Sequence, residues 1–306
     1  MKARATGAAI IMAMLLAALA ATIAATLLWQ QQRWLSAHEH RRDQVQAQAL
    51  ALAGIQWARQ IIHDNAPAGL PVHLGQPWAL RLPAIPIENG SIAGYIVDAQ
   101  SRINVNNLAN NTLQPSTRTA LAQLFTTLAV PPALVNAIGD WVDADDVVSE
   151  PGGAEDAWYL AQGTPSLAAN APVERVDELL AVRGADAVTL QRLRPFLSAV
   201  DAPAAVNVNT ASPEVLSALV PGLDRADALA LTAKRTQTPF VSVFDFRARL
   251  GRPDLIFDDT LVDVKSAWFE VSIEARQGET LARARALLKR SASGADWPSV
   301  VWQTVE

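Results

Sequence analysis

The sequence predicts an α+β protein in which a long N-terminal helix packs on an antiparallel sheet and a large all-α domain is inserted into the chain. Three observations indicate this fold class. No glycine or proline interrupts the chain from Ala8 to Ala53, so one helix can run through that stretch. Residues 268–276 alternate apolar and polar side chains, which is typical of a half-buried strand. Between residues 116 and 200 the apolar spacing is helical.

The N-terminal helix has two chemically different halves. Residues 8–29 carry no charge, and about 22 residues at roughly 1.5 Å each can cross a hydrocarbon layer about 30 Å thick. Residues 30–65 keep an apolar stripe beside glutamine, arginine and histidine, as an amphipathic helix requires, and Pro67 then stops the helix. We expect one rod of about 55 residues, roughly 80 Å long, with 8–29 in the membrane and 30–65 on the globular part.

Three interpretations of this N-terminus stay open at this point. Residues 18–20 could be the cleavage site of a secretory signal, or the helix could be a plain membrane anchor. The third interpretation is a prepilin-like leader, residues 1–7, which a prepilin peptidase removes after Gly7 to leave Ala8 as the new N-terminus. A glycine before the cut suits a peptidase that needs close approach to the backbone.

Composition excludes several functions. The chain has 306 residues, half of them hydrophobic, and a formal net charge of −5. An acidic surface argues against nucleic acid as a partner, because phosphate contacts need clustered lysine and arginine. There is no cysteine, which excludes disulfides and thiolate metal sites. No nucleophile stands beside a base in a convincing catalytic set, so we expect no enzymatic activity.

The elements after the long helix follow from local patterns. Residues 66–90, rich in proline and glycine, predict a loop with a short strand at 78–82. Residues 91–98 and 102–106 predict a β-hairpin. The inserted domain is expected at 113–200, with helices at 117–129, 132–141, 172–183 and 187–197. The α/β domain is expected at 66–112 and 201–306, the latter with a strand at 205–209, helices from Pro213, at 224–235 and at 241–249, and strands at 267–276, 280–290 and 299–305.

One short pattern occurs twice, as Ile103-Asn-Val-Asn-Asn-Leu108 and as Val206-Asn-Val-Asn-Thr-Ala211. Each copy lies where a predicted strand hands over to a helix. Asparagine suits such a corner because its amide replaces missing backbone partners and it tolerates unusual backbone angles. We therefore interpret the two copies as structural caps at strand ends.

A stretch from Asp140 to Asp156 places seven carboxylates in 17 residues around a Pro-Gly-Gly turn. These charges repel one another unless a cation lies among them, and hard oxygen ligands on a loop suit Ca²⁺. The spacing is not that of an EF-hand, since Val148 and Ala154 occupy the sixth and twelfth positions counted from Asp143. A solvated acidic loop is the alternative. The candidate ligands are Asp143, Asp145, Asp146, Glu150, Glu155 and Asp156.

Taken together, these motifs resemble a known family. The Gly7 leader followed by one long helix is similar to type IV pilins and pseudopilins. The two asparagine corners, the acidic loop, the inserted helical domain and the strand around Trp268 resemble the large minor pseudopilin GspK of type II secretion systems. The resemblance implies a type IV pilin-like fold, cleavage between Gly7 and Ala8 by a prepilin peptidase and N-methylation of Ala8. It also implies a calcium-binding α domain and a tip complex with the minor pseudopilins GspI and GspJ, with further pseudopilins below.

Met12 departs from the ordinary pilin pattern. It stands at the fifth mature position, where pilins usually carry a glutamate that neutralises the terminal amine of the neighbour ahead. An unpaired charge in lipid is costly, so a subunit with no neighbour ahead has no use for that glutamate. Met12 therefore fits a subunit at the leading end of a fibre, as the resemblance also implies.

We expect a non-enzymatic protein of the inner membrane, with a cytoplasmic N-terminus and a periplasmic globular part. As a minor pseudopilin at the tip, it would help to start the pseudopilus and to export folded proteins across the outer membrane. The alternative is a membrane-tethered, calcium-dependent binding protein of the envelope that belongs to no fibre.

Overall fold

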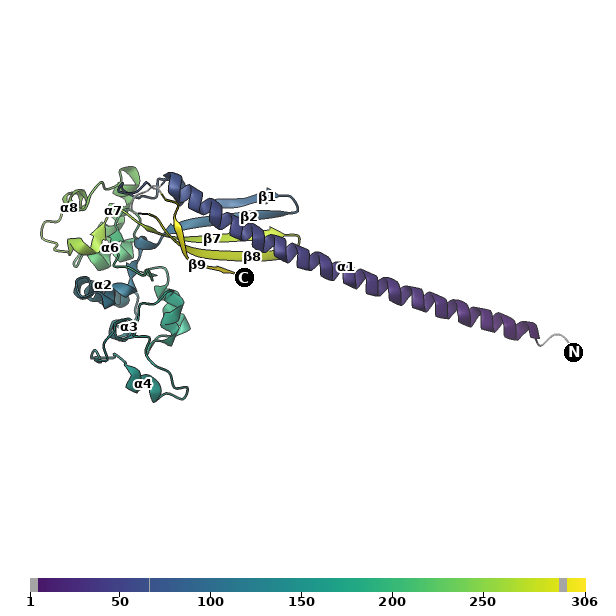
Figure 1. Cartoon of the computed structure of the whole chain (residues 1–306). Coiled ribbons are helices and arrows are strands. Elements are labelled where there is room, and N and C mark those ends of the chain that lie inside the picture. Colours follow the sequence, from purple (N-terminus) through teal and green to yellow (C-terminus); the bar gives the residue numbers. More distant parts are fainter. Residues whose placement is uncertain (1–4, 66, 292–295) are drawn as a thin grey trace.

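The structure is a computed structural model that describes residues 5–65, 67–291 and 296–306. A long helix projects from the molecule, a five-stranded sheet lies along its C-terminal half, and further helices gather at the end remote from the N-terminus (Figure 1). We call residues 103–264 the helical body; most of its buried apolar side chains form one cluster. The predicted α+β fold class is confirmed.

Helix α1 (Ala5–Asn65) is one continuous rod, as predicted. The side chains of residues 8–42 are exposed, whereas Ala47, Ala51, Ile55 and Ile62 are buried against the sheet. The buried positions recur every three or four residues, so they share one face of the helix. The first half of α1 therefore stands free of the globular part, and the second half is held by apolar packing.

The sheet is antiparallel, with strand order β1-β2-β7-β8-β9. The strands are β1 (Leu82–Ile87), β2 (Gly90–Asp98), β7 (Trp268–Gln277), β8 (Thr280–Lys289) and β9 (Ser299–Val305). In β7 the side chains of Phe269, Val271 and Ile273 are buried in the cluster that includes α1, which confirms the predicted alternation. Gly54 lets α1 approach this face, because a Cβ there would lie 2.8 Å from Cγ2 of Ile273.

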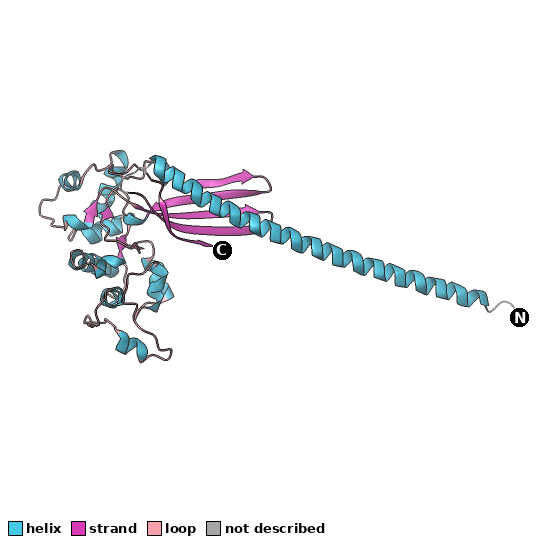
Figure 2. Cartoon of the chain, viewed as in Figure 1, coloured by secondary structure: helices cyan, strands magenta, loops and turns pink. Residues whose placement is uncertain are grey.

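The helical body is built from short helices joined by loops (Figure 2). Its α-helices are α2 (Gln114–Thr127), α3 (Leu134–Val142), α4 (Asp156–Leu160), α5 (Ala187–Leu193), α6 (Pro213–Leu219), α7 (Arg225–Gln237) and α8 (Val243–Leu250). Two of these helices begin with a side-chain cap: Asp186 accepts a hydrogen bond from Thr189 N, and Ser212 accepts one from Val215 N. The body is larger than the predicted insertion at 113–200, because its apolar cluster continues through α6, α7 and α8.

Three local predictions are wrong. β2 pairs with β1 and β7, not with residues 102–106, because a 3₁₀ turn at Ala99–Ser101, capped by Asp98, leads the chain out of the sheet. The segment expected as a helix at 172–183 holds only a 3₁₀ helix, Val176–Ala181. In place of the strand expected at 78–82, the chain forms a 3₁₀ helix, Pro77–Ala79, that buries Trp78, and the strand β1 begins only at Leu82.

The two asparagine corners are structural, as predicted. After leaving the sheet, β3 (Ile103–Asn104) pairs in parallel with β4 (Leu197–Ser198), and β5 (Val206–Asn207) pairs in parallel with β6 (Val262–Asp263). At the second corner the buried Asn207 side chain donates to Val72 O, to Asp98 Oδ2 and to Ser266 Oγ, and it accepts from Asn209 N. These bonds tie the helical body to the end of the sheet.

Candidate cation site and membrane helix

The acidic loop begins where α3 ends and closes where α4 begins. Asp140, in the last turn of α3, is fully buried, and its carboxylate accepts a hydrogen bond from Ser149 N at 3.0 Å. Gly153 lies so close that a Cβ there would be 2.1 Å from Asp140 Oδ2. The loop is thereby folded back onto α3, which brings its two ends together.

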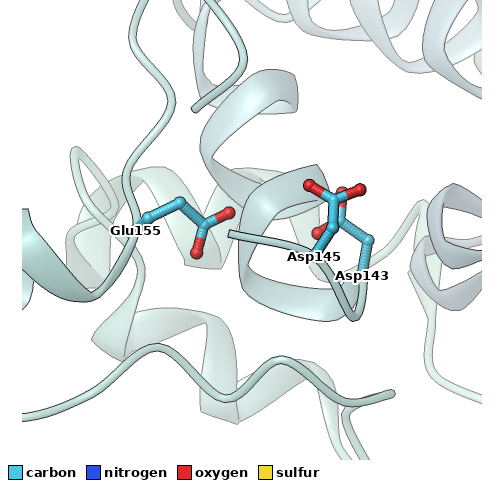
Figure 3. A group of neighbouring side chains, drawn as sticks. All are labelled: Asp143, Asp145 and Glu155. Carbon is cyan, nitrogen blue, oxygen red and sulfur yellow. The ribbon is translucent and has the colours of Figure 1, made fainter. Parts of the chain in front are cut away.

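Three of the six predicted ligands meet at this closure. Asp143 and Asp145 follow α3, and Glu155 directly precedes α4; one carboxylate oxygen from each lies within 4.8 Å of those of the others. Figure 3 shows Asp143 and Asp145 side by side, with Glu155 approaching from the opposite side. The three residues span 13 positions of the sequence, and only the folded loop makes them neighbours.

The three carboxylates repel one another, and no positive charge is paired with them among the described residues. Glu155 is only 3% exposed, and neither of its carboxylate oxygens, nor Oδ1 of Asp143, has a hydrogen-bond partner among the described residues. Burial, and then the charges of Asp145 and Asp140, raise the pKa of Asp143 to about 6. Burial, and then the charges of Asp140 and Asp143, raise the pKa of Glu155 to about 7. Within the described ranges no basic side chain forms an ion pair with the three.

This donor set fits a hard divalent cation. Buried carboxylates are normally paired or coordinate a metal, and Ca²⁺ prefers carboxylate and carbonyl oxygens. Oxygens without partners that converge from both sides of a closed loop provide such ligands. The charge of a cation would also remove the repulsion that raises the two pKa values.

The other three predicted ligands lie outside this group and have partners of their own. Asp146 Oδ1 accepts from Asn170 Nδ2 at 3.3 Å, and Glu150 Oε2 accepts from Gly152 N at 3.3 Å. Asp156 Oδ1 accepts from Ala168 N at 2.9 Å.

Two residues near the site were not among the predicted ligands. Asp140 belongs to the same acidic stretch, and its buried carboxylate holds the loop by accepting the hydrogen bond from Ser149 N. Asn170 has a buried Oδ1 without a hydrogen-bond partner among the described residues, and its φ of 45° is unusual for a residue other than glycine. No sequence signal links Asn170 to the loop; its contact with Asp146 depends on the path of the chain after α4.

The N-terminal part of α1 is long and apolar enough to span a membrane. Of the predicted leader, residues 1–4 lie outside the described residues, and the backbone at Gly7 is already helical. Ala8 and Met12 lie on the free half of α1, where Met12 is 63% exposed. The apolar window of this half is 0% buried, which supports a single-pass membrane anchor.

Comparison with known proteins identifies the family. Two models of the type II secretion system (T2SS) protein K match residues 101–202 and 206–265. The type II secretion system protein K of Klebsiella pneumoniae is 31% identical, over 95% of this chain and 94% of its own length. That of Aeromonas hydrophila is 33% identical over 72% of each. The chain also resembles a chain in the crystal structure of the GspK-GspI-GspJ complex from enterotoxigenic Escherichia coli, with a TM-score of 0.75 and 27% identity, over 90% of this chain and 99% of that one. The protein therefore belongs to the type II secretion system protein K family.

Proposed function

We propose that this protein is a minor pseudopilin at the tip of a type II secretion pseudopilus, where it assembles with GspI and GspJ, helps to start the fibre and supports export of folded proteins across the outer membrane. The observation that carries the proposal is the likeness to a chain of the GspK-GspI-GspJ complex over nearly that whole chain. In this role the protein is structural and not an enzyme. Its N-terminus faces the cytoplasm, and its globular part lies in the periplasm.

Two features of the chain support a position at the tip. The apolar half of α1 carries no carboxylate, so it cannot neutralise the terminal amine of a subunit ahead, and Met12 occupies the position where that carboxylate would stand. The helical body lies at the end of the molecule remote from the membrane helix (Figure 1). Bulk in that place would obstruct a subunit stacked above and is tolerated where no subunit follows.

We infer that the acidic loop binds Ca²⁺ through Asp143, Asp145 and Glu155, with Asn170 as a further oxygen donor. The support is the set of buried carboxylate oxygens without partners. The ion would join the end of α3 to the start of α4 and so hold the outer part of the helical body in one conformation.

Complex formation tests the proposed function. We expect the full chain, co-expressed with GspI and GspJ of the same secretion system and extracted in mild detergent, to purify with both, and we expect its deletion to stop secretion. A calcium-dependent tether outside any fibre would not purify with GspI and GspJ, and secretion would continue without it.

A substitution at Met12 tests the tip position. Met12→Glu supplies the carboxylate that body subunits use, so it should increase incorporation along overexpressed pseudopili, measured by immunogold labelling. Met12→Gln, which has the same size but no charge, is the matched control and should stay at fibre ends. Equal labelling along the fibre for both variants and the wild type would contradict the tip assignment.

A further inference from the structure

A groove of about 770 Å³ lies on the face of the sheet that α1 does not cover. Its floor is formed by β2, β7 and β8, where the side chains of Ala93 and Ser272 are small and leave space. Arg81, just before β1, borders one side, and Arg194, just after α5, borders the other. The groove therefore lies at the junction of the sheet and the helical body.

The charge of this groove is opposite to that of the whole chain. Its lining contains five arginines and only two acidic residues, whereas the chain as a whole has a net charge of −5. The lining arginines are Arg81, Arg102, Arg194, Arg283 and Arg285, and the acidic residues are Glu270 and Glu274. A concave surface of one sign attracts ligands of the other sign and raises their local concentration.

Three of the five arginines are already paired. Arg102 Nη1 lies 2.8 Å from Glu270 Oε2, and Arg283 Nε lies 2.8 Å from Glu274 Oε1. Arg194 pairs with Asp177, a residue of the helical body.

The other two guanidinium groups have no carboxylate partner within the part of the chain that the structure describes. Arg81 lies over the ring of Tyr95, with its Cζ 4.6 Å from the ring centroid. Arg285 is exposed on β8 and lies between this groove and a smaller depression that contains Trp302. These two side chains keep donors available for a ligand.

The strand register sets the distance between them. Tyr95 is opposite Ser272 in β7, and Ser272 is opposite Arg285 in β8. Two strand spacings of about 4.8 Å separate Tyr95 from Arg285, so these two positions lie roughly 10 Å apart, one on each side of Ser272. Arg81 lies over the ring of Tyr95 and therefore marks the first of the two positions. In a polyproline II segment, which has three residues per turn and a rise of about 3.1 Å per residue, side chains three residues apart lie on the same face, about 9 Å apart.

We propose that this groove docks an acidic segment of a partner protein in the extended polyproline II conformation, with one carboxylate on Arg81 and a second, three residues away, on Arg285. Guanidinium groups bind carboxylates with two parallel hydrogen bonds, and the hydroxyl of Ser272 lies between the two contacts. Tyr95, which is 38% exposed, offers apolar surface beside Arg81 at one end of the groove. The inference is independent of the tip position of the subunit.

The position of the groove excludes two other polyanions. From Trp29, at the end of the apolar segment, to Ala47, the first residue of α1 buried on the sheet, the helix extends about 27 Å, so lipid headgroups do not reach the groove. Nucleic acid needs a long basic track, and this groove is a short basic patch on an acidic protein.

The test uses the full chain in neutral detergent micelles and two labelled peptides. The probe is Gly-Ser-Glu-Gly-Ser-Glu-Gly-Ser, with carboxylates three residues apart, and the control peptide has glutamine in place of both glutamates. Fluorescence anisotropy at low salt should show at least tenfold tighter binding of the glutamate peptide, with an affinity that falls as salt rises.

Variants locate the binding. The double variant Arg81→Gln/Arg285→Gln should weaken binding of the glutamate peptide at least tenfold. Arg41→Gln/Arg225→Gln removes two exposed positive charges elsewhere and should change affinity less than twofold. Unchanged melting temperatures confirm that both variants are folded. The proposal is overturned if the glutamate peptide does not bind, if both peptides bind equally, if the two double variants lose affinity equally, or if inorganic phosphate at the same charge concentration displaces the peptide as well as free peptide does.

Discussion

Replacing Glu155 by glutamine should remove the response of this protein to calcium. In the wild type, Ca²⁺ at 100 times its Kd stabilises the folded state by about 2.7 kcal/mol if it does not bind the unfolded chain. For a globular part of this size, 1 kcal/mol corresponds to about 2–4 °C, so the melting temperature should rise by roughly 5–11 °C between metal-free buffer and that calcium concentration.

The substitution takes one of three converging carboxylates out of the group. Two opposite unit charges 4 Å apart attract each other by about 4 kcal/mol at an effective dielectric constant of about 20. A hundredfold loss of calcium affinity, which corresponds to about 2.7 kcal/mol, is smaller than that attraction. At the same calcium concentration the remaining stabilisation is about 0.4 kcal/mol, a shift of roughly 1–2 °C. The assay is circular dichroism of the full chain in detergent, heated with and without Ca²⁺.

Glu150→Gln is the matched control, because it removes the same charge from the same loop but lies outside the group of three. It should keep most of the calcium response. Calcium binding by this group is contradicted if the melting temperature of the wild type does not change with Ca²⁺, or if the Glu150 variant loses the response as completely as the Glu155 variant.

Three further predictions concern stability of the full chain, measured by urea unfolding in detergent. Without metal, the free energy of unfolding should fall as pH rises from about 4 to about 7, because the folded pKa values of Asp143 and Glu155 lie above their unfolded values; a flat profile would contradict the raised pKa values. Asn207→Ala should cost at least about 3 kcal/mol, since it removes four buried hydrogen bonds, including those to Val72 O and from Asn209 N, and a cost below about 1 kcal/mol would show that the corner is dispensable. Ile55→Ala should cost about 2–5 kcal/mol and Val45→Ala, at a site 66% exposed, less than about 0.5 kcal/mol; similar costs would show that α1 does not pack on the sheet as described.

Much of the fold follows from local signals in the sequence. The uninterrupted run after Ala8 predicts the rod, the alternation in β7 predicts its buried face, and Ser212 followed by Pro213 marks the start of α6. Each signal depends on residues close together in the chain, where periodicity and capping decide the structure.

The errors concern long-range pairing. The two β-rich segments around residue 100 are adjacent in sequence, but β2 finds its partner in β7, about 175 residues away, where register and buried faces match. The segment 172–183, expected as an α-helix, forms only the 3₁₀ helix Val176–Ala181, in which the side chain of Leu179 is buried.

In the candidate sites, too, the sequence predicts local features but not which distant residues meet. Composition identifies the acidic loop, but the selection of Glu155 depends on the fold of the loop over Asp140 and Gly153. No sequence pattern connects Arg81 with Arg285, because only the sheet register brings them to one groove.

The role as a pseudopilin requires a processed, membrane-anchored helix, and mass spectrometry of the N-terminus detects that processing. The protein is purified from membranes of cells that express its secretion system, and its N-terminal peptide is sequenced. We predict that the chain begins at N-methylated Ala8 with residues 1–7 removed. Retention of residues 1–7, or cleavage near Ala20, would contradict the assignment of this protein as a pseudopilin.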